Sequence, residues 1–244
     1  MRPLALIALL ALAGCAAQPA GTPSVTVFAA ASLTDVFTEL ETGFEAAHPG
    51  TDIVLSFGGS AALASQIRQG APADVFAAAD ERVMEQVVDA GDVRTPVIFT
   101  SNSLEIAVPP GNPAGIDELA DLTDPGIAVA LCDPQVPCGA LAHLLFETFE
   151  LTPAPDTLEP DVKAVLTKVE LGEVDAGLVY VTDVHAAGPA VEGVLIPEAQ
   201  SLITLYPIGV LTDAPNPAAA QAWIDYVLSP LGQKALADHG FVAF

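Results

Sequence analysis

Short apolar runs alternate with amphipathic runs along most of the chain. Runs with the small, β-branched and aromatic residues of buried strands occupy residues 24–30, 51–59, 73–79, 96–111, 127–132, 176–181 and 203–211. Runs with apolar residues at helical spacing occupy residues 33–48, 61–70, 80–91, 140–151, 162–174 and 216–241, the last long enough for one or two closing helices. This alternation predicts βαβ units, parallel sheets and the α/β fold class. It fits one doubly wound sheet or two lobes joined by two crossing strands, and does not decide between them.

The chain begins with one basic residue, Arg2, and an apolar run, LALIALLALAGC, that ends at Cys15. The run is too short to cross a bilayer as a mature helix and ends in small residues, so it predicts a secretory signal peptide over residues 1–15. Its last four residues are similar to the bacterial lipobox, which predicts lipidation of Cys15; an ordinary signal peptide with a chance cysteine is the alternative. Residues 16–24 lack apolar periodicity and are expected to form a tether. Under both interpretations the protein is exported. It is then either lipid-anchored to the outer face of the cell membrane or periplasmic.

The composition is typical of a globular protein and is strongly acidic. Of 244 residues, 52% are hydrophobic, and seven basic residues stand against 31 acidic ones, for a formal net charge of −24. This length allows one large domain or two lobes with their own cores. Nucleic acid and anionic membrane surfaces bind through clustered Lys and Arg, so neither surface is an expected partner. An anionic ligand would have to be held by local dipoles against the overall field of the protein.

Cys132 and Cys138 stand six positions apart in LCDPQVPCG. In an exported protein, two cysteines around a loop with two prolines predict a disulfide, with free thiols as the alternative. A zinc site would need two further ligands, and the four histidines of the chain are scattered. No cation site is therefore expected.

Four predicted helices begin with residues suited to an anion. They are the helices that follow Ser32, Ser60, Cys138 and Val162. Helices in a parallel α/β sheet begin at the carboxyl ends of strands, where ligands bind, and each helix start offers unpaired N–H donors and a partial positive charge. Several converging starts could hold a dianion without Arg or Lys. The alternative for each serine is an N-cap that only closes its own helix.

Five motifs together give the chain a family resemblance. They are AAASLTDVF, FGGSAALASQI, PADVFAAAD, DPQVPCGALA and GLVYVTD, which follow one another over nearly the whole mature chain. In order and spacing they resemble the molybdate-binding proteins of bacterial ABC transporters. The resemblance implies the type II periplasmic binding-protein fold: two parallel-rich sheets flanked by helices and joined by two crossing hinge strands. It places lobe one at residues 25–105 plus 203–244 and lobe two at residues 106–202.

The resemblance also implies a set of ligand-binding residues. The family holds its tetrahedral oxyanion with two serines, two backbone N–H groups and a tyrosine hydroxyl, which fall on Ser32, Ser60, Cys138, Val162 and Tyr180. Cys138 replaces the alanine more common in the family; a backbone contact should survive the change, although a disulfide to Cys132 could rigidify or slightly move it. The expected ligand is molybdate or tungstate, without any cofactor or bound cation. The expected partner is a membrane permease, and the protein is expected to be a monomer.

The same residues bear on other possible functions. An enzyme is not expected, because the Gly-Gly-Ser-Ala-Ala sequence at Ser60 departs from the nucleophile elbow and no histidine neighbours either motif serine. A binding protein of the same fold for sulfate, thiosulfate or a metal cation is the nearer alternative. An iron binder is disfavoured because Tyr180 and Tyr206, which could have paired, are not adjacent. A third possibility is a lipid-anchored receptor that reports the ligand to a sensor instead of a permease.

Overall fold

The computed structural model describes residues 24–242. The predicted signal peptide with Cys15, and the predicted tether up to residue 23, lie outside the described residues. The strands are β1 Ser24–Ala30, β2 Asp52–Gly58, β3 Val75–Ala77, β4 Val97–Val108, β5 Val129–Cys132, β6 Thr157–Glu159, β7 Ala176–Tyr180, β8 Glu192–Val194 and β9 Ile203–Val210. The helices are α1 Thr34–Ala47, α2 Ser60–Arg68, α3 Glu81–Asp89, α4 Pro137–Thr148, α5 Val162–Glu170, α6 Val181–Ala187, α7 Pro217–Leu228 and α8 Pro230–Asp238. The predicted α/β class is confirmed.

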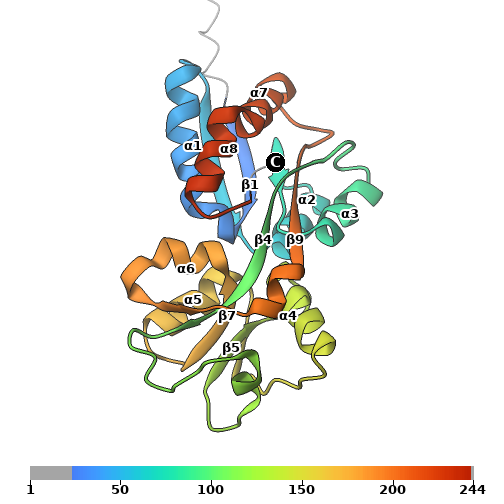
Figure 1. Cartoon of the computed structure of the whole chain (residues 1–244). Coiled ribbons are helices and arrows are strands. Elements are labelled where there is room, and N and C mark those ends of the chain that lie inside the picture. The colour runs from blue at the N-terminus through green and yellow to red at the C-terminus, as the bar shows by residue number, and fades with distance from the viewer. Residues whose placement is uncertain (1–23, 243–244) are drawn as a thin grey trace, which may run out of the picture.

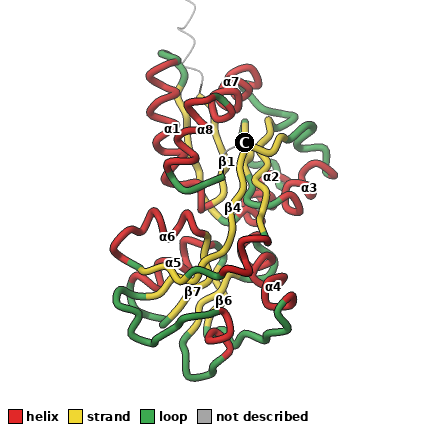
Figure 2. Tube along the Cα trace, in the orientation of Figure 1, coloured by secondary structure: helices red, strands yellow, loops and turns green. Residues whose placement is uncertain are grey.

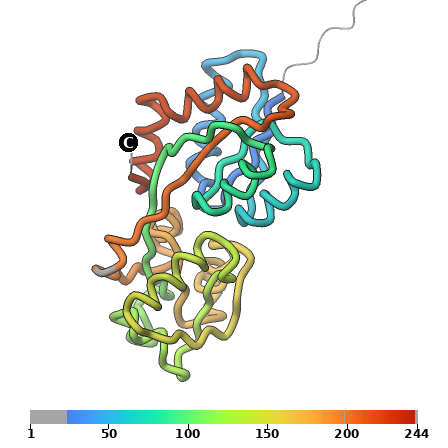
Figure 3. Tube along the Cα trace, turned by 90° about the vertical axis from the view of Figure 1, so that its right-hand side faces the viewer, coloured from blue at the N-terminus to red at the C-terminus, as the bar shows by residue number. Residues whose placement is uncertain are grey.

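These elements form two lobes joined by two long strands (Figure 1). Lobe one contains β1–β3 with α1–α3, α7 and α8, and lobe two contains β5–β8 with α4–α6. Strands β4 and β9 run side by side between the lobes, as the side view also shows (Figure 3). The two-lobed alternative is therefore the correct one of the two left open by the sequence.

The sheets of the two lobes are continuous through β4. The strand order is β2-β1-β3-β9-β4-β7-β5-β6, with β8 also pairing with β4. The first part of β4 pairs with β9, and its last residues pair with β7 and β8. Within each lobe the pairs β1–β2, β1–β3, β5–β6 and β5–β7 are parallel, whereas the crossing strands are antiparallel to their neighbours. The predicted pair of parallel-rich sheets with two crossing strands is confirmed.

Helices lie on both sides of the strands in each lobe (Figure 2). The described residues form three hydrophobic cores between these layers. In lobe one, the sheet packs on one face against α1, α7 and α8, where Trp223 makes edge-to-face contacts with Phe37 and Phe44 at centroid distances of 5.6 Å and 5.5 Å. A second core under α2 and α3 covers the other face. Lobe two has one continuous core around β5, β7 and α4. Separate cores let each lobe keep its shape while the crossing strands bend.

Candidate functional site

A small cavity lies between the two lobes, at the carboxyl ends of the central parallel strands. All five residues predicted to hold a ligand line this cavity: Ser32 and Ser60 from lobe one, and Cys138, Val162 and Tyr180 from lobe two. Apart from Asp161, the rest of the lining is alanine, glycine, valine and proline. The centre of a water-sized sphere can sweep a volume of about 20 Å³, slightly more than one water molecule requires. The cavity therefore suits a compact ligand, with donors from both lobes.

Ser32 does not cap a helix. It lies in a single turn of 3₁₀ helix, Ala31–Leu33, and α1 begins only at Thr34, without a side-chain cap. Its hydroxyl lies 2.9 Å from the hydroxyl of Tyr206, and both side chains are buried. The N-cap interpretation is therefore wrong for Ser32, because its hydroxyl is turned to another strand and to the cavity.

Ser60 is the first residue of α2, and the N-cap is Gly59. The Ser60 hydroxyl accepts a hydrogen bond from the backbone N–H of Ala79 at 3.1 Å. The N-cap interpretation is wrong here also. Because a hydroxyl carries one proton, a Ser60 oxygen that accepts from Ala79 keeps its own O–H to donate elsewhere.

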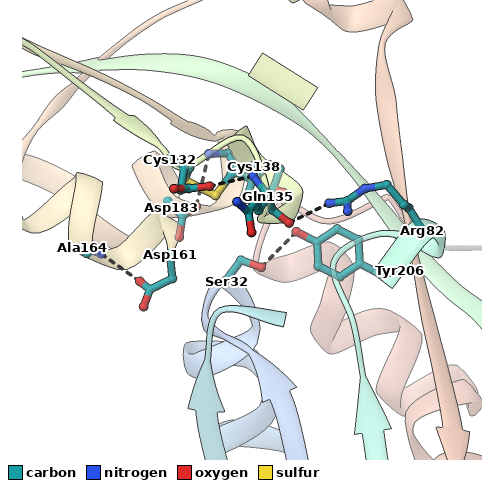
Figure 4. The surroundings of a disulfide bond; sticks show 11 residues. Ser32, Arg82, Cys132, Gln135, Cys138, Asp161, Ala164, Asp183 and Tyr206 are labelled. Atoms are coloured by element: carbon teal, nitrogen blue, oxygen red, sulfur yellow. Dashed lines mark hydrogen bonds between the residues drawn. A yellow bond between two sulfur atoms is a disulfide. The ribbon is translucent and has the colours of Figure 1, made fainter. Parts of the chain in front are cut away.

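Cys138 is the second residue of α4, after Pro137 at the first position. Proline is well suited to this position, since the first N–H groups of a helix have no partner within the helix. A disulfide joins Cys138 to Cys132, the last residue of β5, with 2.06 Å between the sulfur atoms (Figure 4). The disulfide thus ties the start of α4 to the strand end beside the cavity.

Val162 is the first residue of α5, and Asp161 is its N-cap. The Asp161 carboxylate accepts from the N–H of Ala164 at 3.0 Å, so its charge is turned toward its own helix, as Figure 4 shows. The cap satisfies the third N–H of the helix and leaves that of Val162 unmatched by it. The Asp161 carboxylate can therefore lie at the cavity while the backbone N–H groups at the start of α5 bind an anion.

Tyr180 ends β7, and its side chain is 1% exposed. Its hydroxyl has no hydrogen-bond partner among the described residues. Burial, followed by the neighbouring Tyr206 and Asp80, raises the pKa of Tyr180 well above its usual value, so the hydroxyl stays protonated. An unpaired buried hydroxyl costs about 1–3 kcal/mol. A ligand that accepts a hydrogen bond would remove this cost.

The two lobes touch directly beside the cavity. Gly59 packs against lobe two so closely that an added β-carbon would lie 2.4 Å from the carbonyl oxygen of Pro160. Arg82, at the start of α3, donates to the carbonyl of Gln135 in lobe two at 2.9 Å (Figure 4). The structure therefore has its lobes in contact around the cavity.

A lysine links three elements next to the Val162 donor. The Lys163 ammonium lies 2.8 Å from Asp35 on α1 of lobe one and 3.4 Å from Asp183 on α6. Burial opposes its charge, but the two carboxylates together raise the pKa of Lys163. Burial raises the pKa of Asp183 to about 6, against the opposing effect of Lys163. The Lys163 ammonium is thus engaged by two carboxylates at the edge of the site, and it is not among the residues that line the cavity.

The structure corrects one argument from the sequence. Tyr180 and Tyr206 are adjacent in space, with ring centroids 6.1 Å apart, although 25 residues separate them in the chain. Their separation in the sequence was therefore the wrong reason to disfavour iron.

Several residues around the cavity were not found from the sequence. Lys163 and Arg82 lie outside the five motifs, and Asp35 and Gln135 lie within two of them without a predicted role. Tyr206 was considered only as a possible iron ligand, so contacts between distant elements alone give these residues a place at the site. Within residues 24–242, no three His, Cys, Asp or Glu side chains gather as metal ligands would. No helix in that same range has the length and apolar character needed to span a membrane.

The chain is similar to known solute-binding proteins over nearly its whole length. Residues 25–242 match the family model of the bacterial extracellular solute-binding proteins. The chain is 40% identical to the molybdate-binding protein ModA of Mycobacterium tuberculosis over 222 residues, which cover 91% of this chain and 85% of that protein.

Two solved structures share the fold. The periplasmic molybdate-binding protein of Azotobacter vinelandii is 21% identical, with a TM-score of 0.75, and the match covers 90% of this chain and 99% of that one. The sulfate-binding protein SubI of Mycobacterium tuberculosis is 22% identical, with a TM-score of 0.77, covering 90% of this chain and 86% of that one. At these identities the likeness establishes the fold alone, which is the expected periplasmic binding-protein fold.

Proposed function

The chain belongs to the family of bacterial extracellular solute-binding proteins, and from this premise we propose that it captures molybdate, and tungstate with it, for an ABC importer. The ligand would lie in the cavity between the lobes. Ser32 and Ser60 would donate from lobe one, and the N–H groups of Cys138 and Val162 with the Tyr180 hydroxyl from lobe two. A ligand held by both lobes favours the state in which the lobes touch, because only that state makes all five contacts.

One observation carries this proposal: the buried, protonated and unpartnered hydroxyl of Tyr180 in a cavity where three helices begin. The starts of α2, α4 and α5 supply unpaired N–H groups and positive ends of helix dipoles. Within residues 24–242, no Lys or Arg lines the cavity. Neutral donors at helix starts are a known means of holding an anion, and the similarity to molybdate-binding relatives identifies the oxyanion.

The same donors would select the charge state of the ligand. An oxyanion that carries a proton needs an acceptor, and the carboxylate of Asp161 in the lining is turned to the N–H of Ala164 on its own helix. A buried O–H without an acceptor costs about 1–3 kcal/mol. A fully ionised tetrahedral oxyanion would therefore bind more tightly than hydrogen phosphate.

The proposal extends to the setting of the protein. The lobes are assigned to residues 25–105 plus 203–244 and to residues 106–202, and closure would present both lobes to a permease in the membrane. Lipidation of Cys15, with removal of the residues before it, would anchor a monomer at the outer face of the cell membrane. A catalytic role is not proposed, because among the described residues no histidine lines the cavity, and the Asp161 carboxylate there is turned to its own helix.

Sulfate is the second candidate ligand. It is also a tetrahedral dianion, and the fold is shared with a sulfate-binding protein. Because sulfate and molybdate carry the same charge, the donors described above would suit either ion. The two candidates are separated by relative affinity in one titration series.

The test is calorimetric titration of a soluble chain beginning after Cys15 with molybdate, tungstate, sulfate and phosphate. Tight binding of the first two with little of the others is expected. If sulfate binds most tightly, or if no oxyanion binds, the molybdate proposal fails.

A matched pair of variants tests the site itself. Val162→Pro removes one N–H at the first helical position, where proline fits, and the extended backbone of Asp161 before it suits proline as well. Its affinity for molybdate is expected to fall about 10- to 150-fold, the loss of a hydrogen bond to a charged group. Val162→Ala keeps the N–H and should bind nearly as the wild type does. Equal affinities for both variants would remove Val162 from the site.

A further inference from the structure

A buried tyrosine of a crossing strand stands directly behind one of the proposed ligand donors. Tyr206 of β9 is completely buried, and its hydroxyl is 2.9 Å from that of Ser32. Tyr206 does not line the cavity, whereas Ser32 does. The Tyr206 hydroxyl can therefore act on a bound ligand through its hydrogen bond to Ser32.

The hydrogen bond between these hydroxyls has two possible directions, and they have opposite consequences. If Ser32 donates to Tyr206, the lone pairs of Ser32 are left for the cavity and would repel an oxyanion. If Tyr206 donates to Ser32, the Ser32 proton is free for the ligand. Burial keeps Tyr206 protonated by raising its pKa, so its proton is available at every pH at which the protein is folded.

The surroundings of Tyr206 favour the second direction. The bond to Ser32 gives the buried Tyr206 hydroxyl an acceptor for its proton, whereas Ser32 lines the cavity and has a ligand there to receive its own. A buried O–H left without an acceptor costs about 1–3 kcal/mol. The Asn102 carbonyl accepts from the N–H of Ser103 at 3.0 Å, and its amide nitrogen donates to Thr182 at 2.8 Å. Both ends of the Asn102 amide are thus bonded to other residues, and Ser32 remains the acceptor for the Tyr206 proton.

Ser60 has the same arrangement with a donor of fixed direction. A backbone N–H, that of Ala79, donates to the Ser60 hydroxyl from behind. Both motif serines thus have their acceptor side occupied within the protein, one by a backbone group and the other by Tyr206. Each is left with one O–H for the cavity.

From this geometry we infer that Tyr206 is a positioning residue that holds Ser32 as a donor toward the ligand and so excludes oxyanions that carry a proton. The inference rests on the proposed oxyanion site and names a residue through which that site gains its selectivity. Tyr206 lies on the crossing strand β9, so its hydrogen bond joins Ser32 of lobe one to the hinge; on the other crossing strand, Asn102 donates to Thr182 of α6 in lobe two.

Tyr206→Phe is the informative variant. It removes the hydroxyl and keeps the ring, which contacts Phe99, Tyr180 and Phe241. Tyr226→Phe on α7 is the matched control, because it removes a tyrosine hydroxyl from lobe one away from the cavity. Thermal unfolding and near-ultraviolet circular dichroism establish that both variants are folded.

The first readout is a double-mutant cycle with Ser32→Ala, using molybdate. Tyr206→Phe is expected to weaken binding about three- to tenfold, as the loss of one neutral hydrogen bond does. In the Ser32→Ala background the same change should have almost no effect, because the hydroxyl through which Tyr206 acts is gone. Equal effects in both backgrounds would overturn the inference.

The second readout is the ratio of molybdate affinity to phosphate affinity, with phosphate measured by competition. A Ser32 hydroxyl released from Tyr206 can rotate and accept from a protonated oxyanion, so the ratio should fall several-fold in Tyr206→Phe and stay unchanged in Tyr226→Phe. A general loss of structure would weaken both ligands alike, and an unchanged ratio would refute the selectivity role.

The outcome for the wild-type protein separates this inference from the proposed function. If the wild type prefers sulfate, the molybdate proposal fails, and the same cycle and phosphate ratio are measured with sulfate and decide the role of Tyr206. If none of the four oxyanions binds the wild type, both proposals fail.

Discussion

Gly59 provides a direct test of whether contact between the lobes accompanies binding. Its backbone angles, φ −59° and ψ 127°, are open to any residue, so alanine at this position is compatible with lobe one. The obstacle lies across the cavity, where the added β-carbon would stand 2.4 Å from the carbonyl oxygen of Pro160. Neither atom can rotate away, because one is a β-carbon and the other belongs to the backbone. Gly59→Ala can be relieved only if the lobes move apart.

The size of the effect follows from the cost of such overpacking, typically about 1–3 kcal/mol. Because the contact exists only when the lobes touch, this cost falls on the bound state and leaves the separated lobes unaffected. Affinity for molybdate should therefore fall about 5- to 150-fold, at 1.4 kcal/mol for each factor of ten. The melting temperature of the ligand-free protein should change little.

Gly58→Ala is the matched control, since its added β-carbon would make an ordinary contact of 3.7 Å with Leu63. Calorimetric titration should give wild-type affinity for Gly58→Ala and the predicted loss for Gly59→Ala. Small-angle X-ray scattering with molybdate should show that the wild type becomes more compact while Gly59→Ala stays extended. Wild-type affinity and compaction in Gly59→Ala would refute the reasoning, as would an equal loss in Gly58→Ala.

Two further predictions concern the groups around the cavity. Because burial raises the pKa of Asp183 from 3.8 to about 6, its contribution to stability is complete below the unfolded pKa and is lost as the pH rises to about 6. Asp183→Asn should remove this loss of stability. Measured by urea unfolding, the stability of the variant relative to that of the wild type should therefore rise by up to about 3 kcal/mol between about pH 4 and about pH 7. A stability difference that does not change with pH would contradict this. The double variant Cys132→Ser, Cys138→Ser should unfold with about 2 kcal/mol less free energy, as expected for so short a loop, and should bind molybdate more weakly, because the start of α4 carries the Cys138 donor. Wild-type affinity in the double variant would show that α4 keeps its position without the disulfide.

The sequence by itself determined the α/β class and the main strands and helices, because the period of apolar residues reports which face of an element is buried. It also brought Ser32, Ser60, Cys138, Val162 and Tyr180 to attention, and all five line one cavity. Most of them are local features, namely residues where a strand ends and a helix begins. The sequence passed over β6 and β8, since three residues are too few to show a period, and it passed over the short helix α6.

Tertiary structure alone decided which buried groups meet. Tyr206 reads in the sequence as one more apolar position of a buried strand, and only the packing of β9 brings its hydroxyl to Ser32, 174 residues away. Gly59 reads as part of a turn, and only contact between the lobes makes its missing side chain a requirement. Periodicity records whether a residue is buried but not its neighbours, because those neighbours are set by the way distant strands and the two lobes pack together.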